Sequence, residues 1–282
     1  MTIIVIAIGG SLLRPEVEEK HLWLNDLIGI IRERVAAGDR LALVIGGGAP
    51  AREGITLAKP LITDDYHLDK IGIAATRLNA TIIREAFTEG GISVSGIIPT
   101  SVNEAIQLLE ERPVVVMGGT EPGHTTDAVA VRLAASVNAK KCIIATNVAK
   151  VFDEDPRKNP NARSFDNLTH NELQQIVGPA EHKEAGGSSV VDPIAVLEAS
   201  KENLELNIID DQIGSPTNAL DLASYILKSI KIGSNQYPFG PLWPGLYPNW
   251  GSIWALARES GRGAWHCAAR QKAQPCSIGS PQ

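Results

Sequence analysis

Short apolar runs alternate with longer segments of helical periodicity along most of the chain. Runs of strand length, rich in Val, Ile and Leu, occupy residues 2–8, 40–45, 92–97, 114–117, 142–148 and 204–210. Segments in which apolar residues recur every three or four positions occupy residues 17–37, 66–89, 103–111, 125–138, 169–177, 192–203 and 218–230. Parallel strands need crossover helices and become buried on both faces. The alternation therefore predicts a three-layer α/β/α sandwich around a mainly parallel sheet.

Glycine-rich turns follow three of the predicted strands. They are GGS (9–11), GGG (46–48) and GGTEPGHTT (118–126). In open parallel sheets, ligands bind beyond the carboxyl ends of the strands, where turns without side chains let backbone N–H groups approach an anion. Three such turns at one edge predict a single polyphosphate site. For each turn taken alone, glycines that merely close a tight turn are the alternative.

These turns do not match the two commonest nucleotide-binding motifs. The sequence contains no G-x-x-x-x-G-K-[ST], which excludes a P-loop. The stretch GGGAPA (46–51) formally matches G-x-G-x-x-A, but it follows the second strand, and no acidic residue ends a clear strand about twenty positions later. A dinucleotide site is therefore disfavoured.

Composition narrows the classes of partner. The 282 residues are 44% hydrophobic and 21% charged, enough for a large core. A net charge of −6 without a basic stripe argues against a nucleic-acid partner. No apolar run reaches transmembrane length and no basic leader is present, so we expect no membrane association. Three cysteines without metal-type spacing or a disulfide framework favour the cytoplasm.

The composition changes abruptly near residue 234. Residues 235–282 hold four of the five tryptophans and two of the three cysteines, without a clear period. We therefore expect one domain over residues 1–234 and a Trp-rich extension over 235–282 that is poorly ordered. The alternative is an interaction segment whose aromatic side chains dock on a partner subunit.

Six segments together resemble, in order and spacing, the archaeal-type uridylate kinases of the amino acid kinase family. They are AIGGSLL, VIGGGAPAR, DKIGIAATRLNA, VMGGTEPGHTTDAVA, ATNVAKVFDEDPRKNPNA and AGGSSVVDPIA. The resemblance runs from residue 2 to about residue 234, and the GGT-x-PGHTTDA element is specific. It implies the amino acid kinase fold, transfer of the γ-phosphoryl group of ATP to UMP, Mg²⁺ bound through the nucleotide phosphates, and a homo-oligomer, usually a hexamer.

The resemblance also implies roles for individual residues. On the UMP side it places Gly47, Asp69, Thr120, Glu121, Pro122, Gly123, His124, Thr125 and Thr126. On the ATP side it places Gly10, Ser11, Gly48, Arg52, Thr146, Asn147, Phe152 and Asp155. Asp127 and Arg52 are the candidate catalytic residues, and no metal ligand from the protein is expected.

Elementary chemistry supports these roles unevenly. Phosphoryl transfer needs mainly positioning and charge stabilisation, which a glycine-rich double cradle supplies with few catalytic side chains. Asp127 could orient the loop or a Mg²⁺-bound water, or simply be a first-turn acid favoured by the helix dipole. Arg52 could be a fork donor to phosphate, or solvated. His124 could bind the phosphate or the uracil, or be a structural donor.

The sequence departs from the family pattern at several positions. Members often carry lysine at Ala49, Asp-Gly at Ala149-Lys150, tyrosine at Phe152, histidine at Glu121 and lysine at Leu197. A missing cation near a transferring phosphoryl group weakens transition-state stabilisation. A non-catalytic nucleotide-binding or regulatory homologue therefore stays open as an alternative.

Another small-molecule kinase of the same family is a further alternative. An isopentenyl phosphate kinase would be expected to have histidine where Ile45 stands, and an acetylglutamate or carbamate kinase a lysine in the first loop, which AIGGSLL lacks.

Overall fold

The computed structural model describes residues 2–13, 22–146, 151–154, 159, 161–181 and 190–210. Contacts divide the chain into two units, residues 1–233 and 234–282, and the described residues all belong to the first. The helix predicted over 218–230 and the Trp-rich extension lie outside the described residues. A domain boundary near residue 234 stays a prediction.

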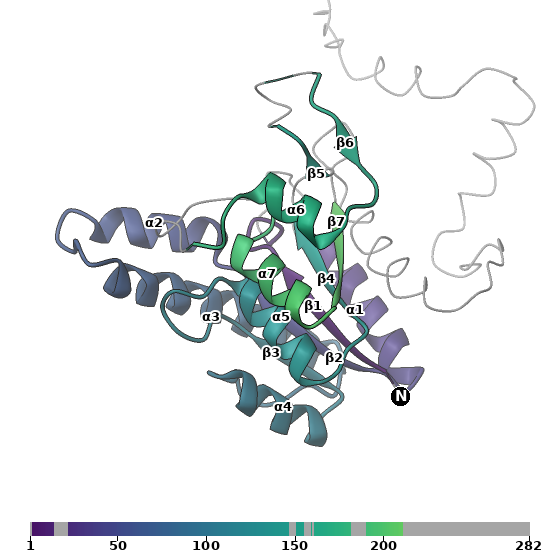
Figure 1. Ribbon diagram of the computed structural model, residues 1–282. Helices are drawn as coiled ribbons and strands as arrows, with labels where there is room; N and C mark the ends of the chain where they lie inside the picture. The colour runs from purple at the N-terminus through teal and green to yellow at the C-terminus, as the bar shows by residue number, and fades with distance from the viewer. Residues whose placement is uncertain are drawn as a thin grey trace, which may run out of the picture. The chain divides into compact units, whose positions relative to one another are not determined.

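Five parallel strands form the central sheet, in the order β3 (Val114–Met117), β2 (Arg40–Ile45), β1 (Ile3–Ile8), β4 (Lys141–Thr146), β7 (Glu205–Asp210). The last residue of β1, Ile8, pairs with Ile45 of β2 and Ala145 of β4. Because every pair is parallel, the carboxyl ends of the strands share one edge of the sheet (Figure 1).

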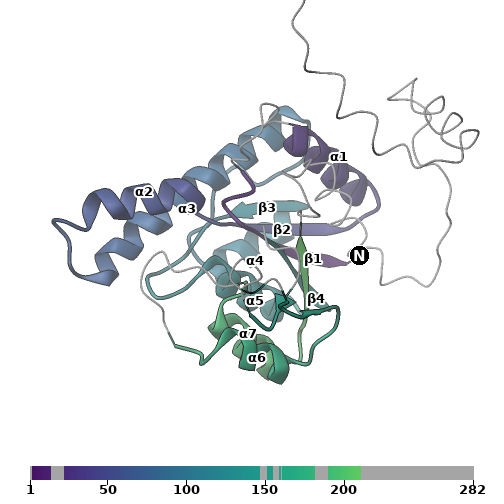
Figure 2. The same ribbon diagram turned by 90° about the horizontal axis from the view of Figure 1, so that it is seen from above.

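Strand side chains alternate between two separate apolar clusters, which makes three layers (Figure 2). Ile4, Ile6 and Ile8 face α1 (Leu22–Ala36) and α3 (Asp65–Glu89). Val5 and Ala7 join the cluster of the opposite face. That face is covered by α4 (Val102–Glu111), α5 (Thr126–Ser136), α6 (His170–Val177) and α7 (Pro193–Lys201). The predicted α/β/α sandwich is confirmed.

Polar side chains begin most of these helices. Ser101 accepts a hydrogen bond from the Glu104 N–H and caps α4, and Thr169 forms a capping box with Glu172 at the start of α6. Asp64 caps α3, whose 25 residues run beyond the sheet and pair with α2 (Gly48–Ala58) (Figure 2). The helix pair α2–α3 brings the GGG turn next to the middle of α3.

The predicted strand over residues 92–97 is wrong. Val94 forms only an isolated parallel bridge with Val114, and no strand continues from it. The Ser95 hydroxyl hydrogen-bonds to both the N–H and the carbonyl of Ile97, which turns the backbone away from the sheet. An antiparallel pair of two-residue strands, β5 (Val151–Phe152) and β6 (Ser164–Phe165), was not expected, because strands this short carry no periodicity.

No helix among the described residues has both the length and the apolar character needed to cross a bilayer.

Candidate active site

The turns after β1 and β2 are packed backbone against backbone. A Cβ atom on Gly10 would lie 2.3 Å from the Gly48 nitrogen and 2.5 Å from the Gly46 oxygen, and one on Gly48 would lie 2.4 Å from the Gly10 oxygen. Gly48 also has a φ of +59°, which side chains rarely allow. The glycines therefore join two separate turns into one side-chain-free surface at the carboxyl edge of the sheet.

A buried amide on α3 holds the GGG turn. The Asn79 side chain is fully buried, and its Nδ2 donates to the carbonyl oxygens of Gly46 at 2.8 Å and Gly47 at 3.0 Å. Both carbonyls are thereby turned toward α3. The buried Asn79 side chain, rather than any side chain of the turn itself, therefore fixes the geometry of the GGG turn.

The same helix holds the GGTEPGHTT loop. The Thr76 hydroxyl accepts a hydrogen bond from the Gly119 N–H at 2.7 Å, and Arg77 donates to the carbonyls of Gly119 at 3.3 Å and Thr120 at 3.2 Å. A Cβ on Gly118 would lie 2.5 Å from the Thr76 hydroxyl oxygen, so only glycine fits. Sequence reasoning missed Thr76, Arg77 and Asn79, although polar residues three apart within ATRLNA were a usable signal.

Asp69, on the first turns of α3, contacts the middle of this loop. Its Oδ2 accepts a hydrogen bond from the Gly123 N–H at 2.8 Å, and Gly123 has a φ of +85°. The structure thus brings Asp69 to the loop over Thr120–Thr126, and the UMP-side role that the resemblance gives to both stays a prediction. By accepting this hydrogen bond, the Asp69 carboxylate holds the loop backbone at Gly123.

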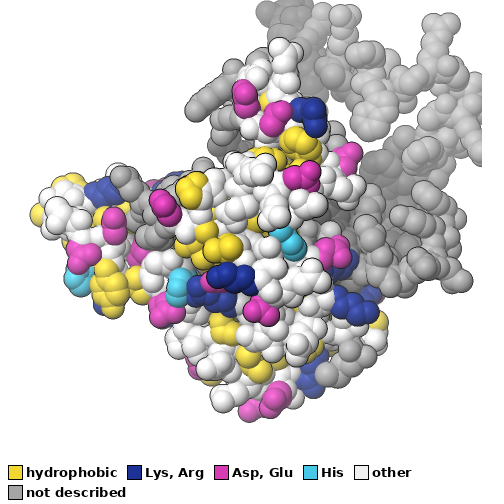
Figure 3. All heavy atoms as spheres, in the orientation of Figure 1, with side chains coloured by type: hydrophobic (Ala, Val, Ile, Leu, Met, Phe, Trp, Pro, Cys, Tyr) yellow, Lys and Arg dark blue, Asp and Glu magenta, His cyan; other side chains and the backbone are white. Residues whose placement is uncertain are grey.

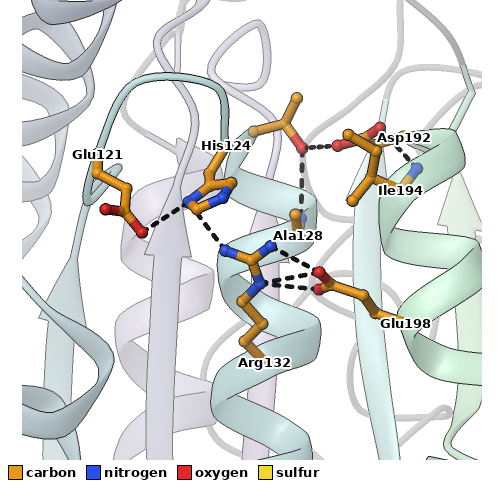
Figure 4. A network of polar contacts seen from close by, with 8 residues as sticks. Glu121, His124, Ala128, Arg132, Asp192, Ile194 and Glu198 are labelled. Atoms are coloured by element: carbon orange, nitrogen blue, oxygen red, sulfur yellow. Dashed lines mark hydrogen bonds and ion pairs between the residues drawn. The ribbon is translucent and has the colours of Figure 1, made fainter. Parts of the chain in front are cut away.

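The start of α5 is joined to the start of α7. Thr125 caps α5 by accepting a hydrogen bond from the Ala128 N–H at 3.3 Å, and its hydroxyl donates to the Asp192 carboxylate (Figure 4). Asp192 in turn caps α7 through the Ile194 N–H at 3.0 Å. The first N–H groups of α5, at Thr126 and Asp127, have no carbonyl one turn earlier to bind, so they suit an anion.

Asp127 is held against this junction. Its Oδ2 accepts a hydrogen bond from the Asp192 N–H at 3.3 Å. Burial raises the pKa of Asp127 to about 6, the Asp192 N–H opposes that rise, and the negative charge of the Asp192 carboxylate adds to it. The Asp127 carboxyl therefore links the start of α5 to the start of α7, and its charge changes near pH 6. Sequence reasoning did not find Asp192.

A second link joins the loop to α7 through charged side chains (Figure 4). Arg132 of α5 donates to both carboxylate oxygens of Glu198 on α7, at 2.6 to 3.0 Å, and its Nη1 lies 2.8 Å from Nδ1 of His124. The same nitrogen of His124 lies 3.0 Å from Oε1 of Glu121. Basic, acidic and histidine side chains accordingly gather over α5 and α7 in Figure 3. Arg132 and Glu198 were not found from the sequence.

The predicted ATP-side residues are placed unevenly. Gly10, Ser11 and Gly48 lie in the packed turns, and Thr146 ends β4 at the same edge. Phe152 is half-buried on β5. Arg52 is exposed on the second turn of α2 and bonds to none of the described residues. Asn147 and Asp155 lie outside the described residues.

Leu197 is the position at which the resemblance leads us to expect lysine. It lies on α7 and is 38% exposed, so it is not a core residue. A longer, charged side chain has room at this position.

An open pocket of about 430 Å³ lies beside Thr120 and Glu121 of the loop. It is lined by Thr100, Ser101, Val102, Asn103, Thr120, Glu121, Arg132 and Ser136. Across the described ranges, no three His, Cys, Asp or Glu side chains gather as a metal site would require.

The chain belongs to the amino acid kinase family, whose model matches residues 2–210. It is similar to the uridylate kinase of Methanocaldococcus jannaschii, with 37% identity over 224 residues, which is 79% of this chain and 96% of the relative. The uridylate kinase of Methanococcoides burtonii is 39% identical over 208 residues, covering 74% and 86%. The crystal structure of uridylate kinase from Archaeoglobus fulgidus superposes with a TM-score of 0.66 at 35% identity, covering 82% of this chain and 96% of that one.

Proposed function

We propose that this protein is a UMP kinase, which transfers the γ-phosphoryl group of ATP to UMP and releases UDP and ADP. The GGTEPGHTT loop carries the proposal. It lies at the carboxyl edge of the sheet, beside the packed Gly10 and Gly48 turns, and α3, α5 and α7 all hold it in place. The uridylate kinases to which the chain is similar support the choice of UMP.

The arrangement suits phosphoryl transfer by positioning. In the proposal, the backbone N–H groups of the Gly10 and Gly48 turns hold the ATP phosphates, and the loop with the N-terminus of α5 holds the UMP phosphate. Asp69 holds the loop at Gly123, and Asp127 keeps the first turn of α5 in register with α7. Two facing anion sites bring donor and acceptor oxygens into line without a covalent intermediate.

Mg²⁺ is proposed to arrive on the ATP phosphates and to neutralise charge that develops there. The carboxylates of Asp127 and Asp192 already accept hydrogen bonds from the chain, so they fit the orientation of a metal-bound water better than direct ligation. Arg52, exposed on α2, is proposed to turn toward the phosphates when ATP binds.

The assembly is proposed to be a homo-oligomer, with the exposed side of α3 as one interface. Leu78 and Ile82 are 54% and 42% exposed on this helix, and Ala74 lies one turn earlier. Two α3 helices crossing antiparallel about Leu78 would place Lys70 of one copy near the acidic end, Glu85 and Glu89, of the other. Such a surface is complementary to itself; the hexamer implied by the resemblance needs a further interface.

Leu78→Glu is expected to lower the oligomer's mass, because it places like charges face to face at the centre of the interface. Sedimentation velocity measures the change. Leu57→Glu, at an 82% exposed position on α2, is the matched control and should leave the mass unaltered. If Leu78→Glu and the wild type had equal oligomer masses, the proposal that α3 forms an interface would be wrong.

The kinase domain is proposed to span residues 1–234, with residues 235–282 as an extension that catalysis does not need. A cytoplasmic location stays a prediction.

ADP release with Mg·ATP and a panel of acceptors tests the function. We expect turnover with UMP and little with CMP, isopentenyl phosphate or acetylglutamate. Binding of UMP without turnover of any acceptor would instead favour the non-catalytic homologue, which is motivated by the departures from the family pattern at Ala49, Ala149 and Leu197.

A further inference from the structure

We infer that Arg132 and Glu198 are positioning residues, which fix His124 of the substrate loop in the tautomer that carries its proton on Nε2. The inference rests on the proposed function, because only that function assigns the loop to the binding of UMP. It concerns residues to which the family resemblance gives no role.

The Arg132–Glu198 pair is built to stay formed. Nε of Arg132 lies 3.0 and 2.9 Å from the two carboxylate oxygens of Glu198, and Nη2 lies 2.6 Å from Oε1. The two side chains are 33% and 23% exposed, so solvent screens them less than a fully exposed pair. The hydrogen bond that Arg132 donates to Glu198 raises the pKa of Arg132 above its ordinary value; burial opposes this rise, and the negative charge of Glu198 adds to it.

This clamp leaves Nη1 of Arg132 to meet His124. The two nitrogens, Nη1 and Nδ1, are 2.8 Å apart. A guanidinium can only donate hydrogen bonds, so the contact requires the lone pair on Nδ1 and puts the ring proton on Nε2. Arg132 thereby chooses one of the two neutral forms of the imidazole.

Glu121 competes for the same nitrogen. Its Oε1 lies 3.0 Å from Nδ1, but a carboxylate can only accept, so this contact would need the proton on Nδ1. The Glu121 side chain is 67% exposed, and exposed pairs contribute little. The less exposed Arg132, itself anchored by Glu198, therefore decides the tautomer, and Glu121 is attracted to the guanidinium instead.

The consequence for the substrate is a fixed donor. Nε2 of His124 makes no hydrogen bond to any residue in the described part of the chain. With its proton on Nε2, the ring offers an N–H to an oxygen of UMP; in the other tautomer it would offer a lone pair, which repels such an oxygen. Glu198, 66 residues away from Arg132 in the chain, thus affects substrate binding indirectly, through Arg132 and His124.

Nitrogen NMR of the histidine-labelled, ligand-free protein tests the tautomer directly. The His124 signals, identified by their loss in His124→Gln, are expected to show a protonated Nε2 and an unprotonated Nδ1 in the wild type. Glu198→Gln should convert them to a mixture and raise the KM for UMP by about tenfold, with the KM for ATP unchanged. Glu198→Asp should recover part of the loss, and Glu202→Gln, exposed just after α7, should change nothing.

Two results would overturn the inference. One is a wild-type His124 with its proton on Nδ1, a result that does not depend on activity. The other is a Glu198→Gln protein that loses thermal stability while both its KM values and its tautomer stay as in the wild type, which would make the pair purely structural. Failure of the wild type to bind or turn over UMP would overturn the proposed function, and with it the loop's part in the inference, even if the tautomer is as expected.

Discussion

Gly10→Ala is expected to abolish UMP-dependent turnover and to destabilise the fold. The new Cβ would lie 2.3 Å from the Gly48 nitrogen and 2.5 Å from the Gly46 oxygen. Both are backbone atoms of a turn that Asn79 already holds, so neither can move aside cheaply. The two turns must separate, which takes the proposed ATP-phosphate donors apart. We expect a loss of about 2–3 kcal/mol in the free energy of unfolding and about a hundredfold or more in kcat.

A matched alanine substitution separates this steric effect from a general effect of glycine replacement. A Cβ on Gly29, inside α1, would meet no atom within 4 Å, so Gly29→Ala should be neutral or slightly stabilising. Urea unfolding and ADP release measure both variants. A Gly10→Ala enzyme with wild-type turnover would mean that the turns do not form the phosphate site.

Asp127→Asn is expected to stabilise the protein at neutral pH while lowering its activity. The folded-state pKa is about 6, above the ordinary value of 3.8, so between these values the folded protein binds more protons than the unfolded chain. Stability therefore falls as pH rises through this window, and the full cost of the charge is present above pH 6. Because Asp127 as a whole residue is only half-buried, we expect a cost of about 2 kcal/mol rather than the full value of the pKa shift.

The asparagine variant cannot ionise but can still accept the Asp192 N–H. Relative to the wild type it should gain about 2 kcal/mol between pH 4 and pH 8, measured by denaturant unfolding at both values. Its kcat should fall by about a hundredfold, because the charge that we propose orients the Mg²⁺-bound water is lost. The wild-type kcat should decline as pH falls through 6, and the variant should lack that decline. If the free energy of unfolding of both proteins changed in the same way between pH 4 and pH 8, ionisation of Asp127 would not destabilise the fold.

The fold was largely readable from the sequence because its strands are buried on both faces. Runs such as VVVM (114–117) have no polar residue to suggest another structure, and the glycines after them mark the ligand edge. Residues 92–97 are similarly apolar, yet the hydrogen bond of the Ser95 hydroxyl turns the backbone away from the sheet after a single β-bridge. A single side-chain bond of this kind has no periodic signature.

The site was only partly readable, for a different reason. Glycines mark the turns in the sequence itself, whereas the side chains that hold these turns come from elements far away in the sequence. Asn79 looks like an ordinary helix residue until its burial against Gly46 is seen, and Arg132 meets Glu198 only because α5 packs on α7. The motif residues Asp69 and Gly123 were found through resemblance, and the hydrogen bond between them came from the structure.

Phosphorus NMR of the wild-type protein with Mg·ATP and UMP tests the central claim most directly, because it follows the γ-phosphoryl group itself. We expect the γ signal of ATP to disappear as the β signal of UDP grows in equal amount, with no inorganic phosphate and no change when UMP or Mg²⁺ is left out. ATP consumed to inorganic phosphate, or UMP bound and left unchanged, would contradict it.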